Sequence, residues 1–321
     1  MKKILILHTG GTIAMSQDES GGVSTTQTNP LMDLPSGTLD AAELVVEDIL
    51  NVPSPHITPE HMLLIKQRIE HALTEGFQAV VITHGTDTLE ETAYFLDITI
   101  GDKLPIVLTG AMRSSNEIGA DGLYNYQSAI KVALADEAIG KGTLVVMNDE
   151  IHTARFVTKT HTTNVATFRT PTFGPIGLIA KGGVRFYQEL IRHDSLPVDQ
   201  VDGLIPIIKA YAGMGDTLEL FTHTKIDGIV IEALGAGNLP PKTVPSIDKL
   251  IEKNIPIVLV SRCFNGVTSG VYDYEGGGRQ LQRKGVMFCD GINSQKARLK
   301  LLVALNASLG GHELYDFITQ S

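Results

Sequence analysis

The chain has 321 residues, and at roughly 100 to 200 residues per domain this length favours two domains. With 43% hydrophobic and 19% charged residues, the composition is typical of an ordinary globular protein and excludes a disordered or fibrous chain. A formal net charge of −10, without a local cluster of lysine and arginine, repels phosphate backbones, so we expect no nucleic-acid partner.

The start of the chain and its cysteines indicate the compartment. The apolar run at residues 4–7 is too short for a signal-peptide core or a membrane span, so we expect a cytoplasmic protein with no membrane partner. Cys263 and Cys289 are isolated in the sequence, which favours free, reduced thiols. The ten histidines form no metal-binding motif, and we expect no metal.

Six short runs of apolar residues predict β-strands. Their hydrophobicity is nearly continuous rather than alternating, as in strands of a parallel sheet that are covered on both faces. The runs are residues 4–7, 79–83, 106–109, 144–147, 226–231 and 257–260. A helix is predicted from Pro59 to Thr74, with Thr58 as its N-cap, and further helices over residues 246–253 and 294–307. Strands and helices alternate, which predicts an α/β fold.

This alternation divides into two series. A more polar stretch before Leu204 separates them. We therefore expect two α/β domains with largely parallel sheets: a larger N-terminal domain over residues 1–190 that carries the chemistry, and a smaller C-terminal domain over residues 205–321. Residues 191–204 are the expected linker.

Two of the predicted strands run directly into turns that contain glycine and threonine. His8-Thr9-Gly10-Gly11-Thr12 follows the first strand, and Thr83-His84-Gly85-Thr86-Asp87-Thr88 follows the second. Because the carboxyl ends of neighbouring parallel strands share one crevice, both turns are expected to present threonine hydroxyls and the backbone amides around Gly11 and Gly85 to one pocket. A plain strand-to-helix turn explains either pattern equally well when it is taken alone.

Residues 16–28 follow the first of these turns. They are polar residues and glycines, with Val23 as the one clearly apolar residue. This composition predicts a mobile loop, placed to cover the pocket at Thr12.

Thr86 has candidate charged partners in the sequence. A threonine hydroxyl is a poor nucleophile near neutral pH, so it needs a base and an orienting charge. Asp87 supplies a charge, and Lys159 is the candidate for the missing base, although a lone lysine is usually a solvated surface residue. Asp87 also fits a helix N-cap with Glu90 three residues later, and the two roles are compatible.

Other polar residues near the turns have mainly structural explanations. His8 and His84 precede the two turns at similar offsets, but a histidine at a strand end is more often part of the hydrogen-bonded structure than a catalyst. Ser54 lies between Pro53 and Pro55, which hold its backbone stiffly and could present its hydroxyl. An ordinary loop serine remains the simpler explanation.

Taken together, the motifs resemble those of the bacterial L-asparaginases over almost the whole chain, and the match looks more like the cytoplasmic type I branch than the periplasmic type II branch. The matching segments are Thr9-Gly10-Gly11-Thr12-Ile13-Ala14, His84-Gly85-Thr86-Asp87-Thr88, Ala111-Met112-Arg113, Asp121-Gly122, Thr158-Lys159-Thr160 and Ala236-Gly237-Asn238-Leu239. The resemblance implies hydrolysis of L-asparagine to L-aspartate and ammonia through an acyl-enzyme on threonine, without a metal or organic cofactor.

The resemblance also implies roles for single residues. Thr12 matches the family's nucleophile, Thr86 a residue that positions water, and Lys159 a residue that tunes Thr86. Asp87 matches the ligand of the substrate ammonium, and Ser54 the residue that holds the substrate carboxylate. In this family the sites are completed by a partner subunit, and Asn238 matches a residue contributed in that way, so a homodimer or homotetramer is implied.

Two departures from the family pattern leave questions open. Many members have a tyrosine in the mobile loop that contacts the nucleophile, but residues 13–30 contain none, and Tyr272 or Tyr274 could replace it across a subunit contact. Pro55 stands where relatives often have a polar, substrate-binding residue. An enzyme that uses both asparagine and glutamine and a non-catalytic amino-acid sensor are therefore retained as alternatives, and the related subunit of a transfer-RNA amidotransferase is less favoured.

Overall fold

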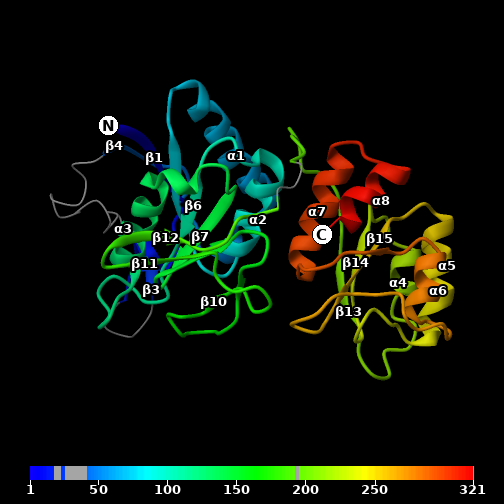
Figure 1. The fold of residues 1–321 in the computed structure, drawn as a ribbon. Helices are drawn as coiled ribbons and strands as arrows, with labels where there is room; N and C mark the ends of the chain where they lie inside the picture. The colour runs from blue at the N-terminus through cyan, green and yellow to red at the C-terminus, as the bar shows by residue number, and fades with distance from the viewer. Residues whose placement is uncertain (18–22, 26–41, 192–194, 321) are drawn as a thin grey trace. The chain divides into compact units, whose positions relative to one another are not determined.

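The computed structural model describes residues 1–17, 23–25, 42–191 and 195–320 of the chain (Figure 1). It divides into two compact units, Met1–Ser195 and Leu196–Ser321. Within the described residues, no helix is both long enough and apolar enough to cross a membrane.

The described part of the first unit is built on a sheet of eight strands, in the order β12-β11-β8-β7-β6-β5-β1-β4. In sheet order, the five neighbouring strands β4, β1, β5, β6 and β7 run parallel to one another. Strands β8, β11 and β12 continue the sheet with antiparallel pairing. Their bounds are β1 Lys2–His8, β4 Ala42–Asp48, β5 Ala79–Thr83, β6 Ile106–Thr109, β7 Thr143–Met147, β8 Glu150–Thr153, β11 Gly177–Ala180 and β12 Gly183–Phe186. The sheet is thus mixed, with the predicted parallel strands at its centre.

The central strands are apolar on both faces because both faces are covered. Ile4 and Ile6 of β1 belong to a core cluster shared with helix α3 (Gly122–Leu134). Leu5 and Leu7, which alternate with them and point to the other face, are equally buried. Helices α1 (Pro59–Thr74) and α2 (Leu89–Ile100) pack on one another, and α2 also packs against β6 and β7. The predicted two-sided burial is confirmed.

Helix α1 has the predicted bounds, and its N-cap is Thr58, whose backbone N–H donates to His61 Nδ1 at 3.2 Å. The predicted N-cap role of Asp87 is wrong. Helix α2 begins one residue later, with Thr88 as its N-cap, because the Thr88 carbonyl accepts the first helical N–H groups, those of Glu91 and Thr92.

Two short hairpins extend from this unit. Strand β2 (Met15–Gln17) pairs antiparallel with β3 (Val23–Thr25), and β9 (Thr158–Lys159) pairs antiparallel with β10 (Phe168–Arg169). The prediction of a loop over residues 16–28 is therefore wrong for the paired residues, since the backbone bonds of the hairpin order them. Its remainder, residues 18–22 and 26–28, lies outside the described residues.

The second unit contains a parallel sheet of four strands within the described residues, in the order β13-β14-β15-β16. Figure 1 shows helices α7 and α8 on one face and α4, α5 and α6 on the other. The bounds are β13 Ile207–Lys209, α4 Glu219–Thr222, β14 Ile229–Ala233, α5 Val244–Glu252, β15 Ile257–Ser261, α6 Gly278–Arg283, β16 Met287–Phe288, α7 Ser294–Asn306 and α8 Gly311–Thr319. Both units are α/β, as predicted.

The strand predicted over residues 226–231 begins later than expected, at Ile229. The Asp227 carboxylate accepts the Leu204 N–H at 2.8 Å, and Gly228 lies so close to Leu301 that a Cβ there would be 2.7 Å from Leu301 Cδ2. These contacts hold Asp227 and Gly228 in a bend before the strand starts.

Candidate active site

The turns after β1 and β5 touch backbone to backbone. Strands β1 and β5 are parallel neighbours, and His8 is the register partner of Thr83. Gly11 has a φ of 84°, and a Cβ on it would lie 2.3 Å from the Gly85 Cα. Only glycine allows the two backbones to approach this closely. Thr12 and Thr86, which follow Gly11 and Gly85 in the chain, therefore lie in adjacent turns.

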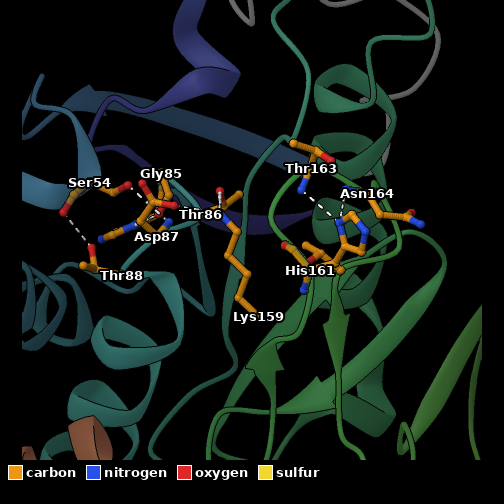
Figure 2. Close-up of polar contacts among 11 residues, drawn as sticks. Ser54, Gly85, Thr86, Asp87, Thr88, Lys159, His161, Thr163 and Asn164 are labelled. Atoms are coloured by element: carbon orange, nitrogen blue, oxygen red, sulfur yellow. Dashed lines mark hydrogen bonds and ion pairs between the residues drawn. The ribbon is translucent and has the colours of Figure 1, made fainter.

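Lys159 connects the second turn to a segment far away in the sequence. Its Nζ donates to Thr86 Oγ1 at 2.9 Å and to Asp87 Oδ1 at 2.7 Å (Figure 2). Thr86 is buried, the Lys159 side chain is 17% exposed, and the Asp87 side chain is 57% exposed. Lys159 is therefore not a solvated surface residue. It forms a charged cluster with a buried hydroxyl on one side and an accessible carboxylate on the other.

Ser54 lies against the same turn. Its hydroxyl oxygen accepts the Asp87 N–H at 3.2 Å, and its carbonyl accepts the Thr88 hydroxyl at 2.8 Å (Figure 2). Ser54 is buried at the start of a short 3-10 helix, Ser54–His56, which follows Pro53. A Cβ on Gly85 would lie 2.6 Å from the Ser54 Cβ, so this contact too requires glycine. Since the Ser54 oxygen accepts a bond, its proton remains for a ligand.

Thr12 begins a second 3-10 helix, Thr12–Ala14, and is half-buried. Within the described part of the chain, its hydroxyl has no hydrogen-bond partner. The two tyrosines considered as its base, Tyr272 and Tyr274, lie in the second unit, where both are exposed and their ring centroids are 5.7 Å apart. Asn238 also lies in the second unit, and its Oδ1 accepts the Gly278 N–H at 3.1 Å.

The histidines before the two turns are buried and hydrogen-bonded. Burial lowers the pKa of His84 to about 4, so the ring is neutral: its Nδ1–H donates to the Gly85 carbonyl at 2.8 Å, and its Nε2 accepts the Thr92 hydroxyl at 2.9 Å. The His8 Nδ1 lies 2.7 Å from Thr83 Oγ1, and burial lowers the pKa of His8 as well, against a smaller opposing effect of Asp48. Both are part of the framework, as predicted.

The residues that follow strand β6 pack against the turn that contains Thr86. A Cβ on Gly110, which follows β6, would lie 2.6 Å from the His84 carbonyl oxygen and 3.1 Å from Thr86 Cγ2. The Asn125 amide of α3 donates to the Gly110 carbonyl and to Asp121 Oδ2, both at 3.0 Å. The sequence did not single out Asn125, because Gln127 and Ser128 beside it in α3 are polar as well.

The residues of this site are thus hydroxyls, a carboxylate, an ammonium and backbone amides. Such a set suits a small zwitterionic ligand with an electrophilic carbon. Within the described residues, no group of three or more histidine, cysteine, aspartate or glutamate side chains is arranged to hold a metal ion.

Two family models match most of the chain. The model for the N-terminal domain of asparaginase matches residues 3–192, and that for the C-terminal domain of glutaminase/asparaginase matches residues 205–317. The chain is 36% identical to L-asparaginase of Bacillus licheniformis over 311 residues, which cover 95% of each protein. It is 39% identical to a probable L-asparaginase of Deinococcus radiodurans over 324 residues, covering 100% of this chain and 98% of the relative.

The chain belongs to the L-asparaginase family.

A solved structure agrees with this assignment. The crystal structure of a probable cytoplasmic L-asparaginase from Campylobacter jejuni has a TM-score of 0.90 at 33% identity and covers 99% of both chains. Proteins named as a probable periplasmic L-asparaginase and as glutaminase-asparaginase match as well. The chain is accordingly an amidohydrolase of the L-asparaginase family. The two glycine-threonine turns, with Thr12 and with Thr86 and Asp87, lie in its first unit.

Proposed function

We propose that the protein hydrolyses L-asparagine to L-aspartate and ammonia at the site formed by Thr12, Ser54, Thr86, Asp87 and Lys159. The observation that carries this proposal is the bridge from Lys159 to Thr86 and Asp87, next to the contact between the Gly11 and Gly85 turns. A hydroxyl and a carboxylate joined by an ammonium suit a reaction at an amide, and a simple strand-to-helix turn needs none of the three groups.

The substrate's charged groups have partners of opposite charge or donors in this site. The exposed Asp87 carboxylate is placed to bind the α-ammonium. The Ser54 hydroxyl, whose oxygen already accepts the Asp87 N–H, donates a hydrogen bond to the α-carboxylate. These two contacts leave the side-chain amide of asparagine directed towards the threonines.

The reaction proceeds in two steps. The Thr12 oxygen attacks the amide carbon while its proton passes to a base, and backbone N–H groups of the Gly11 and Gly85 turns stabilise the oxyanion. The base then returns this proton to the amide nitrogen, the C–N bond breaks, ammonia leaves, and an aspartyl ester remains on Thr12. Water positioned at Thr86 and Lys159 attacks this ester, releases L-aspartate and restores the Thr12 hydroxyl.

Ammonia release from L-asparagine tests this assignment. Thr12→Ala and Thr86→Ala are each expected to lower kcat by about a thousandfold or more, because a nucleophile or its activating group is removed. Thr74→Ala is the matched control, since the Thr74 hydroxyl donates to the His71 carbonyl at the end of α1 and bonds no other group in the described part of the chain. Full activity in both site variants would contradict the proposal.

The covalent step has its own test. Hydroxylamine added during turnover is expected to divert the aspartyl ester to β-aspartyl hydroxamate, and acid-quenched Thr86→Ala enzyme to retain an aspartyl group on the peptide that contains Thr12. Ammonia release with neither product would indicate direct attack by water instead of an ester.

Asparagine is the preferred substrate in this proposal, and glutamine is the second candidate because relatives named glutaminase-asparaginase match the chain. The two substrates differ by one methylene, which a pocket distinguishes by about 1 to 3 kcal/mol. Comparison of kcat/KM for both amides decides the preference. Tight asparagine binding without ammonia release would instead indicate an amino-acid sensor.

The proposed enzyme is a cytoplasmic homodimer or homotetramer in which Asn238 of one subunit completes the site of another, with neither a nucleic-acid nor a membrane partner. Subunit complementation tests the shared site. Thr12→Ala and Asn238→Ala variants, each inactive alone, are expected to regain activity when they are co-expressed, because one hybrid site is intact. Sedimentation analysis gives the assembly, and cell fractionation the compartment.

A further inference from the structure

His8 and Thr83 form a buried polar pair at the base of the two glycine-threonine turns. They are the last residues of β1 and β5, they are register partners, and the His8 Nδ1 lies 2.7 Å from Thr83 Oγ1. His8 is 1% and Thr83 0% exposed. Neither side chain reaches solvent, so neither can bind substrate directly.

We propose that His8 is a positioning residue for the proposed reaction: its bond to Thr83 sets how the turn that carries Thr12 lies against the turn that carries Thr86. The inference rests on the proposed function. It gives His8 a role in the reaction, whereas the sequence alone indicated only a structural role.

Thr83 is bound to the start of the first turn by more than this one contact. Its carbonyl accepts the Thr9 N–H at 3.1 Å and the Thr9 hydroxyl at 3.0 Å. The hydroxyl and the carbonyl of Thr83 therefore both hold the end of β1, while the chain continues from Thr83 into its own turn. His8 supplies the one side-chain bond to the Thr83 hydroxyl that is found within the described residues.

The contact between the turns leaves little tolerance for displacement. A Cβ on Gly11 would lie 2.3 Å from the Gly85 Cα, and Thr12 and Thr86 are the next residues after these glycines. A shift of β1 along β5 therefore changes the separation of the two threonines. Because misplacement by about 1 Å can lower a rate by about a hundredfold, a bond that fixes this register has a kinetic effect.

Packing alone does not account for a histidine at this place. The even-numbered residues before it on β1, Ile4 and Ile6, are apolar and belong to the core cluster that also contains Tyr126. Among the residues that the structure describes, the buried His8 Nε2 has no hydrogen-bond partner. The His8 ring centroid lies 5.9 Å from that of Tyr126, and the register partner of His8 on β4 is Asp48. An unpartnered buried nitrogen is unfavourable, so the bond through Nδ1 is what explains the residue.

The two ring nitrogens can be tested separately. An asparagine side chain places its amide near the position of Nδ1, whereas a glutamine side chain reaches towards the position of Nε2. His8→Asn therefore retains a partner for the Thr83 hydroxyl, and His8→Gln places its amide beyond it. Thr83→Ser and Thr83→Val form the corresponding pair on the other strand, since serine keeps the hydroxyl and valine keeps the shape.

The experiment measures kcat and KM for ammonia release by the full-length wild type and these four variants, together with thermal unfolding of each. His8→Asn and Thr83→Ser are expected to keep kcat within about threefold of the wild type, and His8→Gln and Thr83→Val to lower it by about 10- to 100-fold at nearly constant KM. The double variant His8→Gln/Thr83→Val is expected to be no slower than either single variant, because both remove the same bond.

Equal kcat for His8→Asn and His8→Gln, or full kcat for Thr83→Val, would overturn the inference. A loss that appears only in KM, or that follows the unfolding temperature across the set, would also overturn it. If His8→Gln does not fold, the comparison of Thr83→Ser with Thr83→Val tests the inference instead, since both variants keep the His8 imidazole. A wild type without ammonia release contradicts the proposed function itself, whereas an active wild type with unaffected variants contradicts the inference alone.

Discussion

Lys159 is the residue on which the proposed chemistry depends most directly. It donates to Thr86 Oγ1 and to Asp87 Oδ1, and its side chain is largely shielded from solvent. Lys159→Met removes both bonds at similar length and is expected to lower kcat for asparagine hydrolysis by about 10²- to 10⁴-fold, the usual contribution of a group that moves or stabilises a proton. An ammonia assay measures the effect.

The control for this change is Lys181→Met. Lys181 is exposed in the turn between β11 and β12, so its loss changes the net charge equally without touching the site. Equal activities of the two variants would show that only charge matters and that the contacts of Lys159 do not.

His84 makes the stability of the protein depend on pH. Its folded-state pKa, about 4, lies below the ordinary value of 6.5 because burial disfavours the charged ring. The unfolded chain therefore binds more protons between these values, so the stabilisation is complete above about pH 6.5 and is lost as the pH falls towards 4. Below pH 4 the loss levels off.

The matched variant for this prediction is His84→Asn, which cannot titrate and keeps an amide near the position of Nδ1. Urea unfolding between pH 4 and 8 is expected to show that the wild type loses about 3 kcal/mol more than the variant on acidification. Parallel stability curves would mean that His84 is protonated in the folded protein with an ordinary pKa.

At the scale of elements, the contact between the turns after β1 and β5 depends on Gly11. Gly11→Ala is expected to abolish ammonia release, because its Cβ would lie 2.3 Å from the Gly85 Cα and the three nearest atoms are all backbone atoms, which no side-chain rotation can move away. Activity and urea unfolding of the purified variant check this expectation.

Gly76→Ala separates the clash from backbone strain. Gly76 has a φ of 80°, close to the 84° of Gly11, but a Cβ there meets nothing within 4 Å. Both substitutions therefore carry the strain of a residue with positive φ, about 1 to 3 kcal/mol, and only Gly11→Ala adds the clash. Gly76→Ala should remain fully active, and similar losses in both variants would refute the role assigned to the turn contact.

Elements whose signals are local were predicted well. Helix α1 and strands β5 and β6 have the predicted bounds, because a capping threonine with proline at the first turn, and short apolar runs between turn residues, act over a few positions. The start of β14 was misplaced because contacts of Asp227 and Gly228 with distant residues decide it. The N-cap of α2 was misplaced by one residue, since the Thr88 carbonyl accepts the first helical N–H groups. Strands β4, β8 and β12 were missed because charged or polar residues interrupt their apolar residues. Strand β11 was missed although its four residues, Gly177–Ala180, are apolar.

At the scale of the whole molecule, the two units have separate cores. The second unit buries its own cluster around Ile229, Ile231, Ile257 and Leu259, against residues of α5 and α6. A fragment of residues 196–321 is therefore expected to fold alone and to unfold cooperatively, as circular dichroism on heating would show. The same fragment should release no ammonia, because Thr12, Ser54, Thr86, Asp87 and Lys159 all lie in the first unit. A featureless spectrum would indicate that the unit needs the rest of the chain.

The amino-acid sequence by itself determined the α/β class, the two glycine-threonine turns and, through its motifs, the family. These are properties of local patterns: a run of apolar residues, a glycine that permits a tight turn, a short motif. The domain boundaries at residues 190 and 205 remain predictions of the same kind.

Only the tertiary structure decided which of these groups act together. Lys159 lies 72 positions after Asp87 and Ser54 lies 33 positions before it, yet both contact the same turn. Their meeting depends on the order of strands in the sheet and on glycines at which two backbones touch, and neither is encoded by spacing along the chain. The pairing of His8 with Thr83 has the same origin, because it arises from the register of two strands separated by more than seventy residues.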